Sequence, residues 1–274
     1  MERISDFAHS ILSEDIGRGD LFERCKTASE ACAALIAKSE GLFAGRYYAE
    51  AIAKAMGLEM SLFVDDGEVI APNQRIAELR GSDTAILKTE RTLLNLLQHA
   101  SGIATQTRRF VDRLEGSGVT LLDTRKTRPL LRRLEKYAVR VGGGVNHRFG
   151  LDDCLMIKDT HLARIDDLAA FVSKARKVIP WTATIEVECE TFETAAQAFE
   201  ARVDIVMCDN MPLDLIRQVV VLRDKIAPSI KIEASGNITL ETIAQYAQTG
   251  VDAISTGSLI HHAVWLDFSM KMLK

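Results

Sequence analysis

At 274 residues, with 47% hydrophobic and 26% charged residues, the chain has the composition of a globular protein large enough for one barrel or two modest domains. A net charge of −4 argues against general nucleic-acid binding, and no apolar stretch approaches the roughly 20 residues that a membrane span needs. The five cysteines lack C-x-x-C spacing, and the first residues do not resemble a signal peptide. We therefore expect a cytoplasmic protein with reduced thiols.

The first hundred residues are dominated by helix patterns, with a few short strands among them. Helical spacing covers 28–40 and 46–56, and short strands with turns are expected between about 60 and 80. The stretch from Asp83 to Gly102 predicts an amphipathic helix with Asp83 at its N-cap. The apolar face of this helix consists of Leu87, Leu93, Leu94 and Leu97.

From about residue 120 the pattern changes to short apolar strands separated by helices. The candidate strands are VTLLDTR, CLMIKD, TIEVECE, DIVMCDN, KIEASG and AISTGS. Strand–helix alternation predicts parallel strands joined by right-handed crossovers. The first helix between them is expected from Pro129 to Gly142, because proline favours helix starts and glycine favours helix ends. Its buried stripe consists of Leu130, Leu134, Tyr137, Ala138 and Val141, and its solvated face carries Arg132, Arg133, Lys136 and Arg140.

Nearly every candidate strand ends in polar residues. Active sites of β/α barrels are built from the carboxyl ends of several strands that face one mouth. The pattern therefore predicts a barrel with a site at that mouth. The polar residues are Arg125, Lys126, Lys158, Asp159, Glu188, Glu190, Asp209, Asn210, Ser235, Ser255 and Thr256.

Basic residues gather in the middle of the sequence. The span from Asp123 to His161 holds nine Lys or Arg against five Asp or Glu, which indicates a local site for an anionic small molecule. Arg binds carboxylates and phosphates through two parallel hydrogen bonds, and Lys adds a compact charge. Solvated basic residues after a strand are the alternative interpretation, and Lys158 at a strand end also allows a Schiff base.

Acidic and small residues follow on the next strands. Glu186, Glu188 and Glu190 alternate along one strand and therefore share a face, of which only the residue nearest the mouth is expected to be wet. Glu188 and Asp209, on neighbouring strand ends, could hold Mg²⁺ or accept hydrogen bonds from ribose hydroxyls. The segments ASGNIT and STGS are typical of backbone phosphate clamps, although tight turns use the same residues.

Together these motifs closely resemble the quinolinate phosphoribosyltransferase family. The matching segments, in the family's order, are EDIGRGD, KTERTLLNLLQHASGIAT, LLDTRKTRP, LEKYAVRVGGGVNHRFGL, LMIKDTHL, IEVECE, VMCDNM, EASGNI and GVDAISTGSLIH. The resemblance implies an α/β fold with an N-terminal, sandwich-like α/β domain and a C-terminal, incomplete α/β barrel of about seven strands. We place the first domain at 1–105, with 263–274 free to pack back on it, and the barrel at 106–262.

The resemblance also implies the activity: transfer of a phosphoribosyl group from phosphoribosyl pyrophosphate to quinolinate, with decarboxylation and with Mg²⁺. It implies a homodimer, compatible with a higher oligomer, in which Arg91 of one subunit reaches the partner's site. The residues that it places around the substrates are Arg91, Arg125, Lys126, His147, Arg148, Lys158, His161, Glu188, Asp209, Ser235, Gly236, Gly257 and His261. Catalytic roles fall to Lys126, Lys158, Glu188 and Asp209, and metal binding falls to Glu188 and Asp209.

One position departs from the family pattern. The phosphate turn often reads SGGI in the family and reads SGNI here, so that Asn237 replaces a glycine; Asn tolerates left-handed backbone conformations better than most residues. The closest rival is a paralogue of the same fold associated with molybdenum transport operons, and the intact NHR and IKDTH motifs favour quinolinate. A Schiff-base aldolase and a non-catalytic binding module are two further interpretations of the same barrel.

Overall fold

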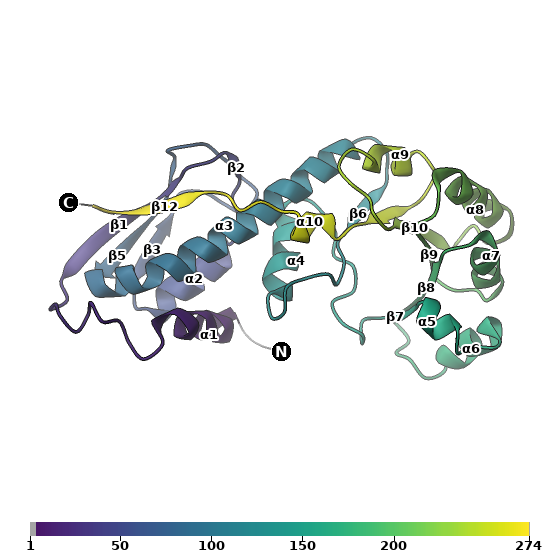
Figure 1. Ribbon diagram of the computed structural model, residues 1–274, viewed down its shortest axis with the longest axis horizontal. Helices are drawn as coiled ribbons and strands as arrows, with labels where there is room; N and C mark the ends of the chain where they lie inside the picture. The colour runs from purple at the N-terminus through teal and green to yellow at the C-terminus, as the bar shows by residue number, and fades with distance from the viewer. Residues whose placement is uncertain (1–3, 274) are drawn as a thin grey trace. The chain divides into compact units, whose positions relative to one another are not determined.

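The computed structural model describes residues 4–273, and the chain divides into two compact units (Figure 1). The first unit comprises the chain through Gln106, the segment Arg133–Gly142 and the chain from Ala263; the second comprises Thr107–Arg132 and Gly143–His262. The segment Arg133–Gly142 thus belongs to the first unit, whereas the sequence places it in the barrel.

The first unit is built on an antiparallel sheet with the strand order β12-β1-β5-β3. Its strands are β1 Glu30–Ala37, β3 Glu59–Leu62, β5 Arg75–Ser82 and β12 Phe268–Leu273, and a small second sheet pairs β2 Gly41–Leu42 with β4 Val69–Ile70. Its helices are α1 Ile4–Ile16, α2 Arg46–Ala55, most of α3 Asp83–Arg113 and nearly all of α4 Arg132–Val141. These bounds agree with the helix expected at 46–56 and the strands expected between 60 and 80.

The helix expected over 28–40 is wrong, because this segment forms β1. The strand lies between β12 and β5 and pairs with both over most of its length. Its alanines favour a helix as isolated residues, but they also let the two faces of the strand pack closely, and Ala33, Ala34 and Ala37 are fully buried or nearly so. Pairing with distant strands, including one from the C-terminus, overrides the local preference.

Two helices differ in detail from the expectation. The helix that begins at Asp83 continues to Arg113, and Leu87 is 39% exposed and lies off its buried face, whereas Leu93 and Leu97 are fully buried. The later helix begins at Arg132 rather than Pro129, and Leu130 is 91% exposed.

The assignment of Lys136 to a solvated face is also wrong. Lys136 is fully buried in α4, as is its neighbour Glu135, whose carboxylate lies 2.8 Å from Nε2 of the buried His99. Tyr137 on the same helix donates to Asp66. Glu135 and Lys136 are therefore buried on what the sequence predicts to be a solvated side, and only Arg140 of the four basic residues is exposed.

The second unit is a curved parallel sheet with the strand order β6-β11-β10-β9-β8-β7. Every candidate strand is present: β6 Thr120–Leu122, β7 Cys154–Ile157, β8 Thr184–Cys189, β9 Ile205–Asp209, β10 Lys231–Ser235 and β11 Ala253–Ser255. An isolated parallel bridge from Leu122 to Val145 adds a single-residue contact beyond β6, at the place of a seventh strand. Within the described chain the sheet does not close between Val145 and β7, so the barrel is incomplete, as expected.

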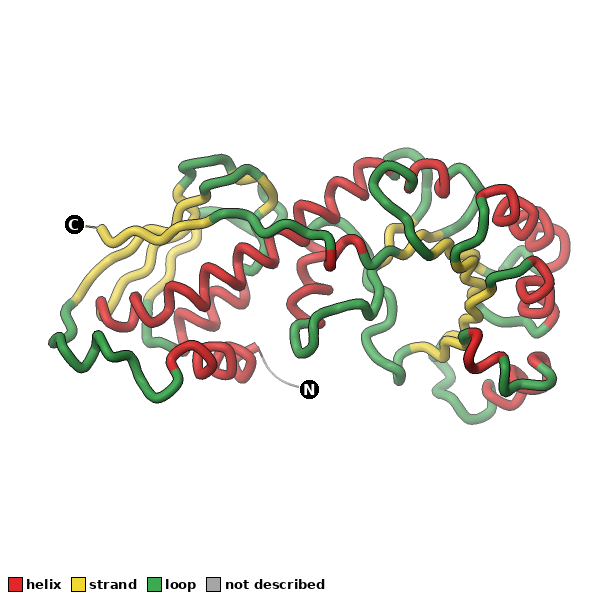
Figure 2. Tube along the Cα trace, viewed as in Figure 1, coloured by secondary structure: helices red, strands yellow, loops and turns green. Residues whose placement is uncertain are grey.

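Helices cover the outer face of this sheet, and the strands curve around the inside (Figure 2). The helices are α5 Asp159–Leu162, α6 Leu168–Ala175, α7 Phe192–Glu200, α8 Leu213–Ile226, α9 Ile243–Ala247 and α10 Ser258–His261. Side-chain caps start two of them: Asp167 accepts from the Ala170 amide, and Thr191 accepts from the Thr194 amide. A bilayer could not be crossed by any helix of the described chain, because none is sufficiently long and apolar.

Candidate active site

A pocket of about 400 Å³ opens at the carboxyl ends of the parallel strands in the second unit. This volume lies within the range of small-molecule sites. The lining residues come from every strand of the sheet or from the turn that follows it: Thr124, Arg125, Lys126, His147, Arg148, Met156, Lys158, Glu188, Met207, Asp209, Asn210, Ser235, Gly236, Asn237 and Ser255. The barrel mouth predicted from the sequence is therefore where the cavity lies.

Strand register explains which side chains meet there. Residues two apart on a strand share a face, so Glu188 lines the pocket while Glu186 lies one layer deeper and is fully buried. Glu190 follows the strand and is exposed. Glu188 pairs in register with Met207 and Asp209 with Ser235, which brings the inward residues of β8, β9 and β10 into adjacent positions.

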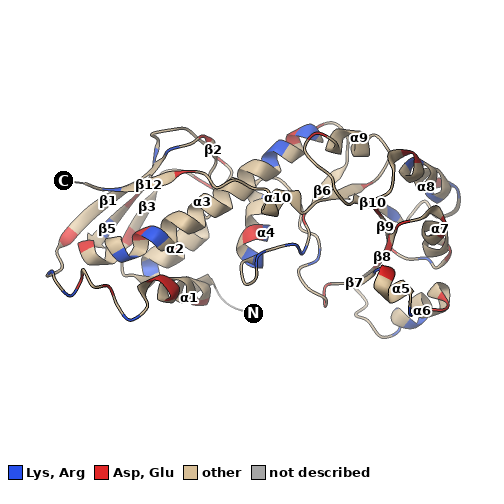
Figure 3. Cartoon of the chain, viewed as in Figure 1, with Lys and Arg blue, Asp and Glu red and all other residues tan. Residues whose placement is uncertain are grey.

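Three cations in the pocket lack a carboxylate partner among the described residues. Arg125 and Lys126 follow β6, where Figure 3 shows basic residues between β6 and α4, and Arg148 follows the glycine-rich segment. Arg148 donates to the carbonyl of Cys154 at 3.0 Å and to Sδ of Met156 at 3.3 Å. Burial, together with the positive charges of Arg148 and Arg132, lowers the pKa of Arg125. An anion in this pocket would relieve that repulsion.

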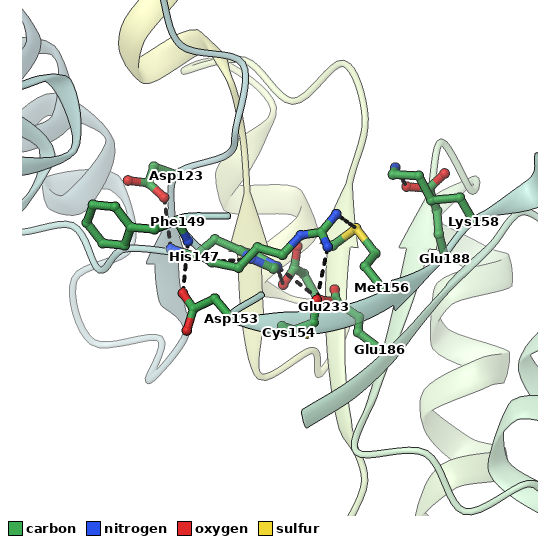
Figure 4. A network of polar contacts seen from close by, with 11 residues as sticks. Asp123, His147, Phe149, Asp153, Cys154, Met156, Lys158, Glu186, Glu188 and Glu233 are labelled. Atoms are coloured by element: carbon green, nitrogen blue, oxygen red, sulfur yellow. Dashed lines mark hydrogen bonds and ion pairs between the residues drawn. The ribbon is translucent and has the colours of Figure 1, made fainter. Parts of the chain in front are cut away.

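The fourth cation is paired. Ile157 on β7 is in register with Val187 on β8, so the next residues along, Lys158 and Glu188, lie side by side and form an ion pair (Figure 4). Schiff-base lysines are activated by desolvation or by another cation, whereas this lysine contacts a carboxylate and its side chain is 39% exposed. The contact favours a binding role for Lys158 over the aldolase interpretation.

The two carboxylates expected at a metal both line the pocket. Oδ2 of Asp209 accepts from the Asn210 side chain at 2.8 Å, and Glu188 contacts Lys158, so each carboxylate retains an oxygen without a hydrogen bond among the described residues. Hard oxygen donors on neighbouring strands are suited to Mg²⁺. The residues therefore fit the ion that the resemblance implies.

The two predicted phosphate turns lie against each other. Oγ1 of Thr256 and Oγ of Ser258 both donate to the carbonyl of Ile238, at 3.0 and 3.4 Å. Gly236 and Asn237 adopt φ values of 94° and 51°, so the asparagine takes the left-handed conformation expected of it. The Asn237 amide donates to Oδ1 of Asn210 at 2.9 Å, which joins this turn to the end of β9.

Below the mouth, His147 contacts two buried acids from different strands (Figure 4). Its Nε2 lies 3.2 Å from Glu186 on β8 and 3.4 Å from Glu233 on β10. Burial raises the pKa of Glu233. Burial opposes a charged imidazole, but hydrogen bonds from the His147 ring to the two acids, together with their negative charge, raise the pKa of His147. Both shifts favour the retention of an additional proton within this group at neutral pH.

The remaining predicted residues lie outside the pocket lining. His161 is exposed, and its Nδ1 accepts from the Lys158 amide at the start of α5. His261 is exposed beside His262, and partial desolvation of its ring together with the nearby charges of His262 and Lys126 lowers its pKa. Gly257 is buried against Lys126 and His261. Arg91 is exposed on α3 and belongs to the first unit.

Comparisons with known proteins cover nearly the whole chain. Residues 20–101 match the quinolinate phosphoribosyl transferase N-terminal domain, and residues 103–271 match the C-terminal domain of the same family. The chain belongs to the quinolinate phosphoribosyltransferase family.

Individual members of this family are similar over most of their length. A protein of Bacillus subtilis named probable nicotinate-nucleotide pyrophosphorylase [carboxylating] is 45% identical, with 94% of this chain and 89% of the relative covered. The human nicotinate-nucleotide pyrophosphorylase [carboxylating] is 39% identical, with 88% and 82% covered. The solved nicotinate-nucleotide pyrophosphorylase of Francisella tularensis is 34% identical with a TM-score of 0.90, and 98% of this chain and 96% of that chain are covered.

Sequence reasoning assigned no substrate role to several residues that lie in or below the pocket. Asn210, named only as a polar strand end of DIVMCDN, lines the pocket and contacts both Asp209 and Asn237. Glu233, in KIEASG, is not among the predicted residues because an acid within a short apolar strand gives no indication of its partner. The buried carboxylate of Asp123 binds the His147 amide at 2.8 Å, a contact that depends on a loop 24 residues away.

The geometry of Gly236 generates a prediction about the phosphate turn. A Cβ at this position would lie 2.3 Å from Oδ1 and 2.8 Å from the backbone nitrogen of Asn210, at a φ that disfavours any side chain. We expect Gly236→Ala to weaken the binding of ribose 5-phosphate by about 5-fold to 150-fold, since backbone strain of this kind costs about 1–3 kcal/mol. Titration calorimetry measures the effect.

Asn237→Gly is the matched control, because glycine accepts the same φ and restores the more common family motif. It should bind ribose 5-phosphate far more tightly than the alanine variant. Equal binding by wild type and Gly236→Ala, with thermal midpoints showing both folded, would contradict the role given to this turn.

Proposed function

We propose that this protein transfers the phosphoribosyl group of phosphoribosyl pyrophosphate to quinolinate and releases carbon dioxide and pyrophosphate, giving nicotinate mononucleotide for NAD biosynthesis. One observation carries the proposal: a single pocket combines three cations that lack carboxylate partners among the described residues with two carboxylates. Relatives named nicotinate-nucleotide pyrophosphorylase [carboxylating] that cover most of the chain support the same reaction.

Both substrates are highly charged anions, which accounts for the cations. Quinolinate carries two carboxylates, and Arg125 and Arg148 present forked guanidinium groups suited to them. Lys126 and Lys158 add point charges for the pyrophosphate group. Fixed cations in a partly desolvated pocket stabilise charge that develops during reaction more strongly than water does.

The carboxylates serve the other half of the chemistry. We propose that Glu188 and Asp209 bind the ribose hydroxyls and hold Mg²⁺. When bound, Mg²⁺ neutralises charge on the leaving pyrophosphate. The two side chains themselves stabilise the positive charge that develops on the ribose ring as the anomeric carbon loses its leaving group.

The bond changes balance without a covalent enzyme intermediate. The bond between the anomeric carbon and the pyrophosphate oxygen breaks, and the ring nitrogen of quinolinate forms a bond to that carbon. The ring is then a pyridinium cation. It stabilises the electron pair left on the ring carbon when the bond to the carboxylate breaks and carbon dioxide leaves. That ring carbon then takes a proton. Catalysis rests on Lys126, Lys158, Glu188 and Asp209 as charge-bearing groups.

Three features of the surroundings complete the proposal. The protein acts as a homodimer, compatible with a higher oligomer, in which the exposed Arg91 of one subunit contacts a substrate anion at the partner's pocket. His161, His261 and Gly257 lie near substrate in the assembled enzyme. A reducing cytoplasm is the compartment that five free cysteines suit.

The first prediction from this proposal concerns substrate choice. Nicotinate mononucleotide should form from quinolinate only when a divalent cation such as Mg²⁺ is present, because the leaving pyrophosphate otherwise keeps its full charge. Nicotinic acid, which lacks the second carboxylate, should react far more slowly. Product formation followed by chromatography, with and without a chelator, tests both points; equal rates with the two acids would contradict the role of the cations.

The second prediction concerns subunit mixing. Arg91→Ala and Lys158→Ala homodimers should each be nearly inactive. Reassorted mixed dimers would hold one site with both lesions and one with neither, so activity should return to about a quarter of wild type, because half of randomly paired dimers are mixed and each has one intact site.

Mass spectrometry of the mixed sample provides the necessary control, because it shows whether the subunits have exchanged. Arg140→Ala, which removes an exposed arginine on α4, serves as the control variant in place of Arg91→Ala. If exchange is complete and no activity returns in the Arg91→Ala and Lys158→Ala mixture, Arg91 does not act across an interface.

A further inference from the structure

Two asparagines connect the carboxylate of Asp209 to the predicted phosphate turn. Nδ2 of Asn210 donates to Oδ2 of Asp209 at 2.8 Å, and Nδ2 of Asn237 donates to Oδ1 of Asn210 at 2.9 Å. All three side chains line the pocket. The proposed chemistry gives a role to Asp209 and to the turn, but none to the two amide side chains between them.

The sequence of donors and acceptors fixes the direction of both amides. An ionised carboxylate only accepts hydrogen bonds, so Asn210 has to turn its NH₂ group toward Asp209 and its oxygen toward Asn237. Asn237 has to present its own NH₂ group to that oxygen. Without a donor at position 237 the Asn210 amide is free to rotate, and an oxygen turned toward Asp209 would repel the carboxylate.

The backbone brings the two asparagines together. Asp209 and Ser235 are in register on the neighbouring strands β9 and β10 (Figure 1), and the backbone N–H of Asn210 donates to the carbonyl of Ser235 at 2.9 Å. Both asparagines adopt left-handed φ values, 53° at Asn210 and 51° at Asn237. Left-handed backbone costs free energy at residues other than glycine and is concentrated at functional sites. A function for this pair is therefore expected.

The turn also packs directly against the Asn210 amide. A Cβ at Gly236 would lie 2.3 Å from Oδ1 and 2.5 Å from Cγ of Asn210, so no space separates the turn from this side chain. The position of the turn therefore determines the position of the amide. Both asparagines are exposed in the open pocket, and a ligand that covers them would remove water and strengthen their hydrogen bonds.

We propose that Asn237 is a positioning residue that acts through Asn210 to hold Asp209 in place when a phosphate occupies the turn. The sugar phosphate and the divalent cation then tighten each other's binding. The inference rests on the proposed function, because it takes the turn to bind the 5′-phosphate and Asp209 to hold the cation. Asn237 itself contacts neither the phosphate nor the cation.

Direct contact between the Asn237 amide and the phosphate is the competing role. Its NH₂ group already donates to Asn210, whereas the backbone N–H groups of Gly236 and Asn237 make no hydrogen bond within the described chain. Successive backbone N–H groups in left-handed turns form concavities that bind anions. This arrangement leaves the phosphate to the backbone and the side chain to the link with Asp209.

The coupling can be measured with Mn²⁺ as the metal and ribose 5-phosphate as the sugar phosphate. Electron paramagnetic resonance counts free Mn²⁺ and so gives its dissociation constant with and without bound ribose 5-phosphate. The factor by which ribose 5-phosphate tightens Mn²⁺ should be roughly threefold to tenfold larger in wild type than in Asn237→Gly, the range that one side-chain hydrogen bond supports. Calorimetry without Mn²⁺ should show both proteins binding ribose 5-phosphate with the same affinity.

Asn73→Gly is the matched control, because Asn73 is another exposed asparagine with a left-handed φ, 69°, and lies outside the pocket lining. It should couple the two ligands as wild type does. Equal coupling in wild type and Asn237→Gly would overturn the proposal. A loss of ribose 5-phosphate affinity by Asn237→Gly without Mn²⁺ would also overturn it, because Asn237 would then be a direct phosphate ligand.

Asn210→Gly tests whether the two asparagines act in series. Its φ suits glycine, and its loss breaks the same path, so Asn210→Gly alone and the double variant with Asn237→Gly should show the same coupling factor. Additive losses would show that the asparagines act separately and would overturn the proposal. None of these measurements uses quinolinate: a protein that shows the coupling but does not convert quinolinate would refute the proposed reaction and support the link.

Discussion

Repulsion between Arg125 and Arg148, in a pocket that Lys126 also lines, is the interaction on which the site depends. Burial and the charge of Arg148 lower the pKa of Arg125, and none of the three cations has a carboxylate partner in the described chain. Elsewhere acids accompany the bases, as Asp252 accompanies Arg223 and Asp83 accompanies Lys26. Cations without a neighbouring negative charge cost stability, and a dianionic substrate supplies that negative charge.

The parallel sheet makes this arrangement possible. Strands in fixed register deliver Glu188, Asp209 and Ser235 to the mouth, so polar groups that are distant in sequence meet there. The segments that follow strands supply the cations Arg125, Lys126 and Arg148 and the unusual backbone of Gly236 and Asn237. The buried group of His147, Glu186 and Glu233 lies one layer below and connects the mouth to the interior.

Much of this can be predicted from the sequence, and the exceptions have physical causes. All six parallel strands and their polar ends are predictable, because strand–helix alternation is a local pattern. The segment 28–40 has the pattern of a helix but forms a strand because its pairing partners, β5 and β12, are distant in sequence. The helical periodicity of the sequence places Lys136 in solvent, because the pattern of one helix does not show which other elements pack against its polar side. The inward orientation of His147 likewise depends on Glu233, which is 86 residues away.

Quinolinate binding to Arg125→Ala, measured by titration calorimetry against wild type, tests the central claim most directly. The variant is expected to bind at least tenfold more weakly, with a loss of about 2–5 kcal/mol, because one partner of a largely desolvated charge pair is removed. Arg140→Ala, in which an exposed arginine outside the pocket is lost, should bind as wild type does. Equal affinity of wild type and Arg125→Ala would contradict the claim that uncompensated cations in this pocket recognise the substrate.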